Sequence, residues 1–350
     1  MKKELLLSVL HAYKGERTIY GAFHILQGKK TAQSIQDGHF FSVLPFYNLL
    51  PDLTRQEVDD LTHTLESNGL IRRTEEDKAI LTKQGERSVH RFTEDHDFIS
   101  DLNGWKYLRQ TSIFWLRLTL LIQTATHIKA NQPRFIPITN HRDSQQWVKN
   151  HLQRYQGGVD ALLDDIYKDI SSYLQTCRSE QAQAFVMQLS SPAQVGLTLH
   201  QISQTLNLDS IKTNILHKAT LHRLFNACED GAFPSLYACM GGKENQTFST
   251  ETALKTAQLM KQGLKMDQII QARGLKQSTI EDHIVEIALY DTSFSIEPYV
   301  SDQEIAAIVK ASMELQTLKL KELRSVLGDD YTYFKIRMAL TRKDPSYGAS

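Results

Sequence analysis

The segment GLKMDQIIQARGLKQSTIEDHI, residues 263–284, constrains the fold of this chain more than any other part of it. Its apolar residues recur at the spacing of a helix-turn-helix, at Ile269, Leu275, Ile280 and Ile284. This spacing predicts two helices joined by a sharp bend, across which Ile269 contacts Ile280 and Ile284. Gly274 supplies the positive φ that such a bend requires, and Leu275 is expected to fill the corner.

The second helix of this motif presents the first candidate contacts for a ligand. Ser278 is expected to cap it, with Glu281 hydrogen-bonding back to the backbone. Its outward face is then predicted to hold Gln277, Thr279, Asp282, His283 and Glu286, with Lys276 at its entrance. The residues that suit DNA are Lys276, Gln277, Thr279 and His283, because such side chains bond phosphates or base edges. Asp282 and Glu286 would repel phosphates, so docking of this helix on a protein stays an alternative.

The region after this motif is more basic. Its cations outnumber Glu322, Asp329 and Asp330, and they are Lys319, Lys321, Arg324, Lys335, Arg337, Arg342 and Lys343. Tyr331, Tyr333 and Phe334 lie among them. Basic residues interleaved with aromatic ones suit single-stranded or frayed nucleic acid, through charge and stacking. A solvated face whose aromatic rings turn into the core explains the pattern equally well. Residues 246–350 together are predicted to form one helix-turn-helix domain.

Residues 1–98 are predicted to form a winged-helix-like domain. Helices are expected over 18–27, within 31–49 and over 55–67, and Thr54 and Glu57 have the spacing of a capping box at the start of the third. The apolar pattern then changes period over 70–82, around the charged turn at 75–77, which predicts a β-hairpin. Arg72, Arg73 and Lys78 of this hairpin are candidate phosphate contacts. The alternative is a helical bundle with a solvated charged loop.

Residues 99–245 are predicted to form a helical middle domain, a bundle with helices over 105–129, 143–156, 159–177 and 179–189. The stretch 197–225 has Ile202, Leu206 and Leu208 where a second helix-turn-helix would place them. Thr213 falls where an apolar residue is needed, so plain bundle helices are preferred here. The polar run 241–245 is interpreted as a linker. The fold class is therefore mainly α, with one small hairpin.

Composition limits the location and the chemistry of this chain. The formal net charge is zero, so any nucleic-acid site must be a local patch. The cysteines, Cys177, Cys228 and Cys239, have no paired spacing, which indicates reduced thiols in a cytosol. The first residues lack the long apolar region of a secretory signal, and the apolar run 113–122 is too short to cross a bilayer. A cytoplasmic protein without membrane contact is expected.

The residue patterns of catalysis and cofactor binding are missing from the sequence. Gly241-Gly242-Lys243 is not a phosphate-binding loop, because Tyr237 stands where the first glycine belongs and Glu244 replaces the Ser or Thr. The spacing of His217, His222 and the cysteines matches no zinc pattern. No enzyme activity, metal or cofactor is therefore expected.

The stretches QLMKQGLKMDQIIQARGLKQSTIEDHI and LKLKELRSVLGDDYTYFKIRMAL resemble the helix-turn-helix domain at the C-terminus of many bacterial RecQ-type helicases. The total length and the helical upstream region resemble the YpbB family of Gram-positive bacteria. That family has this domain without a helicase core, and its genes commonly neighbour a short RecQ-type helicase that lacks such a tail. The N-terminal domain resembles a RecQ-type winged helix more loosely.

The resemblance implies a DNA-binding accessory factor that acts with a RecQ-type helicase in DNA repair or recombination, and that prefers fork or single-stranded DNA to a specific duplex site. Two alternatives belong to other classes. One is a transcription regulator with two DNA-binding domains, and the other is a protein–protein adapter without nucleic-acid contact.

Overall fold

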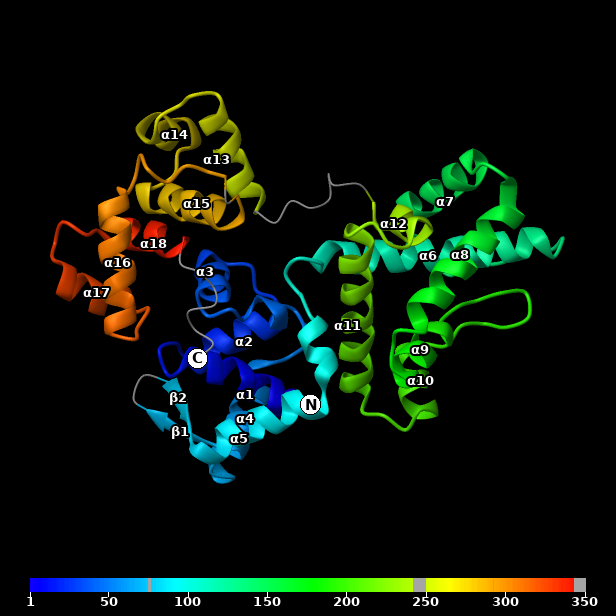
Figure 1. The fold of residues 1–350 in the computed structure, drawn as a ribbon, viewed down its shortest axis with the longest axis horizontal. Helices are drawn as coiled ribbons and strands as arrows, with labels where there is room; N and C mark the ends of the chain where they lie inside the picture. The colour runs from blue at the N-terminus through cyan, green and yellow to red at the C-terminus, as the bar shows by residue number, and fades with distance from the viewer. Residues whose placement is uncertain (75–76, 242–249, 292, 343–350) are drawn as a thin grey trace. The chain divides into compact units, whose positions relative to one another are not determined.

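The computed structural model describes residues 1–74, 77–241, 250–291 and 293–342, and these are mainly helical, as predicted (Figure 1). They form two compact units. One comprises Met1 and Arg91–Gln246, and the other comprises Lys2–His90 and Thr247–Ser350. The first and third predicted domains therefore belong to the same compact unit; the predicted boundaries themselves stay a prediction. No helix in the described ranges is long and apolar enough to cross a membrane.

The N-terminal half of the second unit has the order of a winged helix. Its helices are α1 (Lys2–Tyr13), α2 (Ile19–Gln27), α3 (Ala32–Phe40) and α4 (Arg55–Ser67), with a 3-10 turn at Leu44–Phe46. The capping box at α4 is confirmed, because the Glu57 carboxylate accepts from the Thr54 backbone N–H at 2.8 Å. Gly69, with φ +67°, then turns the chain into the hairpin.

The hairpin pairs β1 (Ile71–Thr74) antiparallel with β2 (Lys78–Leu81). Ile71 and Ala79 are buried, so these two positions fix the strands to the core. Thr18, just before α2, forms a further antiparallel bridge with Lys78. Thr18 thereby holds the position of the short first strand of a winged helix. The predicted hairpin is confirmed, although Glu75 and Glu76 of its charged turn lie outside the described residues.

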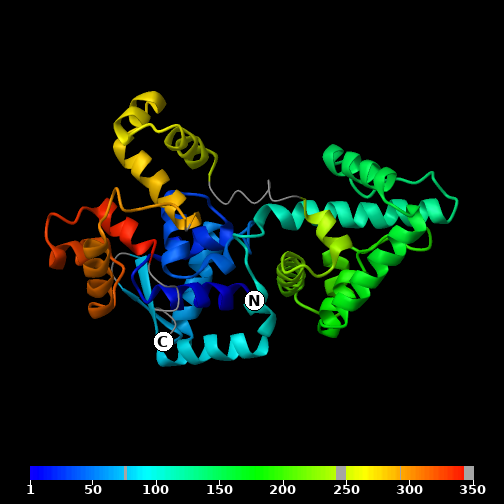
Figure 2. The ribbon, with the colours of Figure 1, turned by 45° about the horizontal axis from the view of Figure 1, so that its top comes forward.

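The C-terminal half of this unit contains α13 (Glu251–Lys261), α14 (Met266–Arg273), α15 (Gln277–Tyr290), α16 (Asp302–Glu314), α17 (Leu320–Leu327) and α18 (Tyr333–Leu340). Its core includes Ile269, Ile280 and Ile284, the residues that the spacing had predicted to meet. α15 is the central helix. It packs against α13, α14 and α18, and also against α3 of the N-terminal half (Figures 1 and 2).

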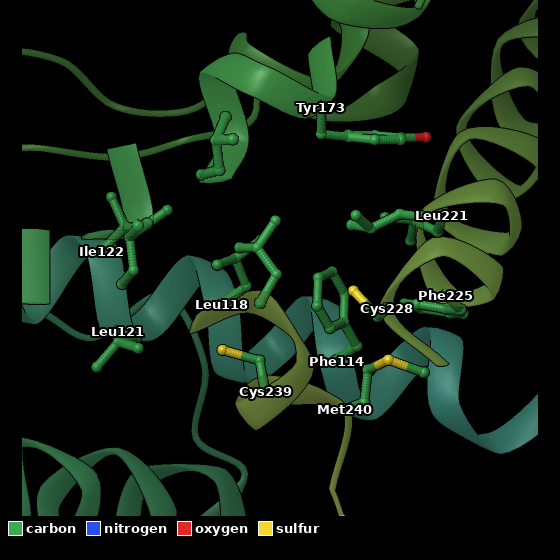
Figure 3. Close-up of a cluster of buried hydrophobic side chains, with 14 of the residues drawn as sticks. Phe114, Leu118, Leu121, Ile122, Tyr173, Leu221, Phe225, Cys228, Cys239 and Met240 are labelled. Carbon is green, nitrogen blue, oxygen red and sulfur yellow. The ribbon is translucent and has the colours of Figure 1, made fainter. Parts of the chain in front are cut away.

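The other unit is a helical bundle. After α5 (Lys83–Asp95) and a 3-10 turn at Asp97–Asp101 it contains α6 (Leu108–Lys129), α7 (Arg142–Arg154), α8 (Gly158–Leu174), α9 (Ser179–Val186), α10 (Leu199–Thr205), α11 (Ser210–Glu229) and α12 (Pro234–Met240). Figure 3 shows apolar side chains from α6, α8, α11 and α12 meeting in its core, with Cys228 and Cys239 among them as free thiols.

The stretch 197–225 forms α10, a tight turn and α11. Asn207 has φ +52° in this turn, so the local shape is that of a helix-turn-helix. Thr213 is buried as that position requires, and its hydroxyl donates to the Asp209 carbonyl oxygen at 3.1 Å. Beyond this motif, α11 packs against α6, α9, α10 and α12. These contacts make α11 a central helix of the bundle and agree with the bundle interpretation.

Candidate nucleic-acid interface

The bend of the helix-turn-helix has the predicted geometry. Gly274 ends α14 with φ +61° and ψ +30°, the left-handed conformation that glycine adopts without strain. The start of α15 differs from the prediction. The helix begins at Gln277, Lys276 occupies the capping position, and no side chain caps it. Ser278 as the cap was therefore wrong, and the Glu281 carboxylate accepts from the Gln277 side-chain amide at 2.8 Å instead.

The predicted outward face of α15 is largely covered by α13. His283 is only 7% exposed, and its Nδ1 lies 2.9 Å from the Thr256 hydroxyl on α13. Glu286 is also buried, and its carboxylate accepts from the backbone N–H and hydroxyl of Thr250 at the start of α13. The expected outward positions of His283 and Glu286 were wrong, because α13 packs on the face that the motif left free. In this arrangement His283 holds two helices together.

Replacing His283 with Ala is expected to destabilise this unit by about 1–3 kcal/mol, because it removes a buried side chain and leaves the Thr256 hydroxyl without that partner. Burial, then the nearby Arg273, lower the pKa of His283, so the neutral ring is the form that packs here. Urea unfolding at pH 7.5 tests this. A stability equal to that of the parent would contradict the burial of His283, and Gln277→Ala, at an exposed position, is the control.

Two of the predicted DNA-binding cations are occupied within the domain. Arg337 of α18 is only 13% exposed in its side chain and pairs with Asp282, while Glu281 lies 3.6 Å away. Lys335 bonds the Glu304 carboxylate at 2.6 Å, and this contact and the capping bonds from Ser301 lower the pKa of Glu304 to about 2. Asp282 is thus neutralised by α18 and does not face a ligand alone. Arg337 and Lys335 stabilise the packing of α18.

The first turn of α15 stays open. Lys276, Gln277 and Ser278 are exposed and Thr279 is partly exposed. Since no side chain caps this helix, its first backbone N–H groups point outward with the positive end of the helix dipole. Such an N-terminus is suited to phosphate. Of the four candidates on this helix, three therefore stand where a phosphate can reach them.

The remaining cations of the C-terminal region differ in how free they are. Lys319 lies 2.9 Å from Glu322, and Arg324 lies 3.1 Å from Asp329 with its guanidinium over the Tyr333 ring. Lys321 is exposed and makes no ion pair with another described residue. The aromatic residues are divided as well: Tyr333 is exposed, whereas Phe334 packs against Tyr299 in the core.

The β1–β2 hairpin, which corresponds to the wing of a winged helix, carries two exposed arginines. Arg72 and Arg73 of β1 face solvent, and neither forms an ion pair within the described part of the chain. Lys78 is half-buried on β2, beside Thr18. The hydrogen bond from Lys319 and, more weakly, the charge of Lys78 lower the pKa of Glu322. Lys78 therefore neighbours a carboxylate of the C-terminal half, which makes it a weaker phosphate contact than the two arginines.

Sequence reasoning missed the charge of α4, the helix that directly precedes the β1–β2 hairpin. It carries Glu57, Asp59, Asp60 and Glu66 against the single cation Arg55. Sequence reasoning also missed three exposed lysines around α14, which are Lys255 and Lys261 of α13 and Lys265 before α14. The acidic run was readable in the sequence, but which lysines face solvent depends on the packing of α13.

Comparison with known proteins identifies the class first. A family described as a helix-turn-helix domain matches residues 252–340. The C-terminal part of the chain is thus a helix-turn-helix domain, a kind of domain in which DNA binding is common. No solved structure matches it.

A particular relative extends this match to the whole chain. Over 347 residues, 98% of this chain and 97% of the relative, it is 29% identical to Protein YpbB of Bacillus subtilis (strain 168). The chain is a homologue of that protein over nearly its full length, which confirms the predicted YpbB-family relationship.

Proposed function

We propose that this protein is a non-catalytic, DNA-binding accessory factor that acts with a RecQ-type helicase in DNA repair or recombination. The observation that carries the proposal is the location of the free cations in the unit Lys2–His90 and Thr247–Ser350. Of the predicted contacts, the free cations are Arg72 and Arg73 on the wing, Lys276 just before α15 and Lys321 on α17, so they are spread over separate elements and do not line one open helix face. Cations scattered in this way suit contacts with phosphates, which position a protein on DNA but carry no sequence information.

This location favours DNA shape over DNA sequence as the feature that is recognised. α15 is buried from His283 onward, so this part of the helix cannot enter a major groove of DNA. α4 is accessible but carries an excess of carboxylates, which phosphates repel. A transcription regulator needs a helix or strand that reads base edges, and this class is therefore less well supported than an accessory factor that binds forks or single strands.

The helicase partner and the repair or recombination role rest on the resemblance of the C-terminal domain to that of RecQ-type helicases. An accessory factor would supply in trans the DNA-binding domains that a short helicase lacks. The acidic face of α4 supports one second candidate, an adapter that binds the helicase without touching DNA, because carboxylates suit a basic protein surface.

Binding to fork, single-stranded and duplex DNA, measured by fluorescence anisotropy alongside pull-down of the RecQ-type helicase from the same organism, separates these functions. An accessory factor binds the helicase and binds forks or single strands with little sequence preference. A regulator protects one defined duplex sequence. An adapter binds the helicase and ignores all three DNAs.

Replacing Arg72 and Arg73 together with Ala is expected to weaken fork binding and to lower the salt dependence of log K by about one unit for each phosphate that the wing no longer neutralises. Both side chains are exposed, so the fold is expected to stay intact. Arg109→Ala with Lys149→Ala removes the same charge from exposed positions of the other unit and serves as the control. An unchanged affinity and an unchanged salt slope would assign the wing to protein docking.

A further inference from the structure

The loop between α6 and α7 exposes an apolar side chain that the fold does not use. Ile136 is 89% exposed, and Ile138 is also exposed two residues later. Pro133 and Pro137 stiffen the chain around them by fixing φ. Single exposed apolar residues are common on proteins, so exposure alone does not mark a site. The way in which this loop is held makes Ile136 different.

The backbone on both sides of Ile136 is fixed by one buried side chain of α6. The Gln123 amide donates to the carbonyl oxygen of Ile136 at 3.1 Å, and its oxygen accepts from the N–H of Ile138 at 3.0 Å. The ring of His127, in the last turn of α6, stacks on the Phe135 ring of the loop with 4.4 Å between ring centroids. The loop is therefore preorganised, although the Ile136 side chain adds nothing to the core. An ordered loop loses little conformational freedom when a partner binds it.

The charges around the loop indicate the kind of partner. Residues 127–142 contain no Asp or Glu, and Arg134 and Arg142 are exposed without an ion pair to any described residue. Lys129 forms an ion pair with Asp160 of α8 at 2.9 Å, and Asp143 lies in the first turn of α7 beside the loop. Two free arginines bordered by carboxylates are too few to hold a phosphate backbone. They do complement a protein surface whose acidic residues surround an apolar pocket.

We propose that Ile136 is a docking knob that inserts into an apolar pocket of a partner protein, with carboxylates on the rim of that pocket facing Arg134 and Arg142. The inference rests on the proposed function in one respect, since that function makes the RecQ-type helicase the partner. It adds the surface of contact, which lies in the helical bundle and not in either DNA-binding half. Truncation of one central apolar anchor is the kind of change that dominates interface energetics.

The test uses the full-length chain and the RecQ-type helicase from the same organism in biolayer interferometry. Ile136→Asp is expected to weaken binding at least about tenfold, mainly through faster dissociation. Val195→Asp is the matched control, because Val195 is 85% exposed on another loop of the same unit, and it should bind like the parent. Equal thermal unfolding of both variants and the parent shows that neither change alters the fold.

Two further variants test the geometry. Arg134→Glu with Arg142→Glu should slow association and weaken its salt dependence, while Gln123→Met should weaken binding although Ile136 is intact. If the parent binds the helicase and Ile136→Asp binds it equally well, the inference fails and the partnership stands. If Ile136→Asp instead reduces only fork binding, the loop is a DNA wedge and protein docking is wrong. If the parent does not bind the helicase, the partnership and this docking surface fail together.

Discussion

Replacing Ile280 with Ala is expected to cost roughly 2–5 kcal/mol of stability in the unit that contains the helix-turn-helix. Ile280 is fully buried, and it packs in the same core as Ile269 and Ile284. The change removes three carbons from the interface of α14 and α15, and the surrounding helices relax only partly into the cavity. The loss is a large fraction of the stability of a typical domain.

Hydrogen exchange in α14 and α15 of the full-length chain measures this loss, because it reports the opening of these helices separately from the rest of the chain. Ser278→Ala is the control. Ser278 is exposed and does not cap α15, so this variant should stay within about 0.5 kcal/mol of the parent. Parent-like protection in Ile280→Ala would show that α14 and α15 do not pack as a helix-turn-helix.

The helix-turn-helix could be predicted from the sequence for a simple geometric reason. Ile269, Gly274 and Ile280 are close together in the chain, and helix geometry alone brings them together once the bend is placed. The hairpin and the capping box at Thr54 were predictable for the same reason, since each depends on residues a few positions apart. Local spacing was therefore enough for the fold class and for the position of the bend.

The exposed face of α15 was not predictable in this way. The motif assigns one face of its second helix to the core and leaves the other face open, but α13 covers that face. Val285 and Ile287 lie beyond the predicted core face, and such an apolar pattern around the whole helix was a readable sign of burial. The Thr256 contact to His283 carried no such sign, because it joins two polar residues 27 positions apart.

Contacts between distant parts of the chain also decided which cations are free. Arg337 and Asp282 are 55 residues apart, so no local pattern could show that they pair. The union of the two terminal segments depends on still longer separations. The Glu16 carboxylate accepts from the Leu318 N–H at 2.8 Å across 302 residues, and the rings of His39 and Tyr290 meet at 5.1 Å.

Acidification is expected to destabilise the helical bundle from about pH 6.5 downward, because two histidines of α11 are buried in their neutral form. His222 accepts from the Asn103 N–H at Nδ1, at 3.0 Å, and its Nε2 lies 3.2 Å from the Thr111 hydroxyl. Burial, and then the charge of Lys218, lower the pKa of His222 to about 3. The same causes lower the pKa of His217 to about 4.

The direction of this change in stability with pH follows from proton binding. Both histidines bind protons at higher pH in the unfolded chain than in the folded one, so the stability that they contribute is complete above about pH 6.5 and is lost as the pH falls toward their folded pKa values. Each histidine is expected to contribute a slope of about 1.4 kcal/mol per pH unit in that window. Protonation of His222 also removes the acceptor of the Asn103 N–H, which leaves a buried donor unsatisfied.

Urea unfolding of the full-length chain between pH 7.5 and 5 measures this slope. His222→Asn keeps an acceptor near the Nδ1 position and removes the titrating group. This variant should be less stable than the parent at pH 7.5, because the Thr111 hydroxyl no longer has its ring partner. On acidification its stability should fall less steeply than that of the parent, with a slope smaller by about 1.4 kcal/mol per pH unit. His200→Asn, at an exposed position, should keep the parent slope. A His222→Asn slope equal to the parent's would mean that His222 already accepts a proton in the folded bundle, in which case its Nδ1 cannot be the acceptor for Asn103.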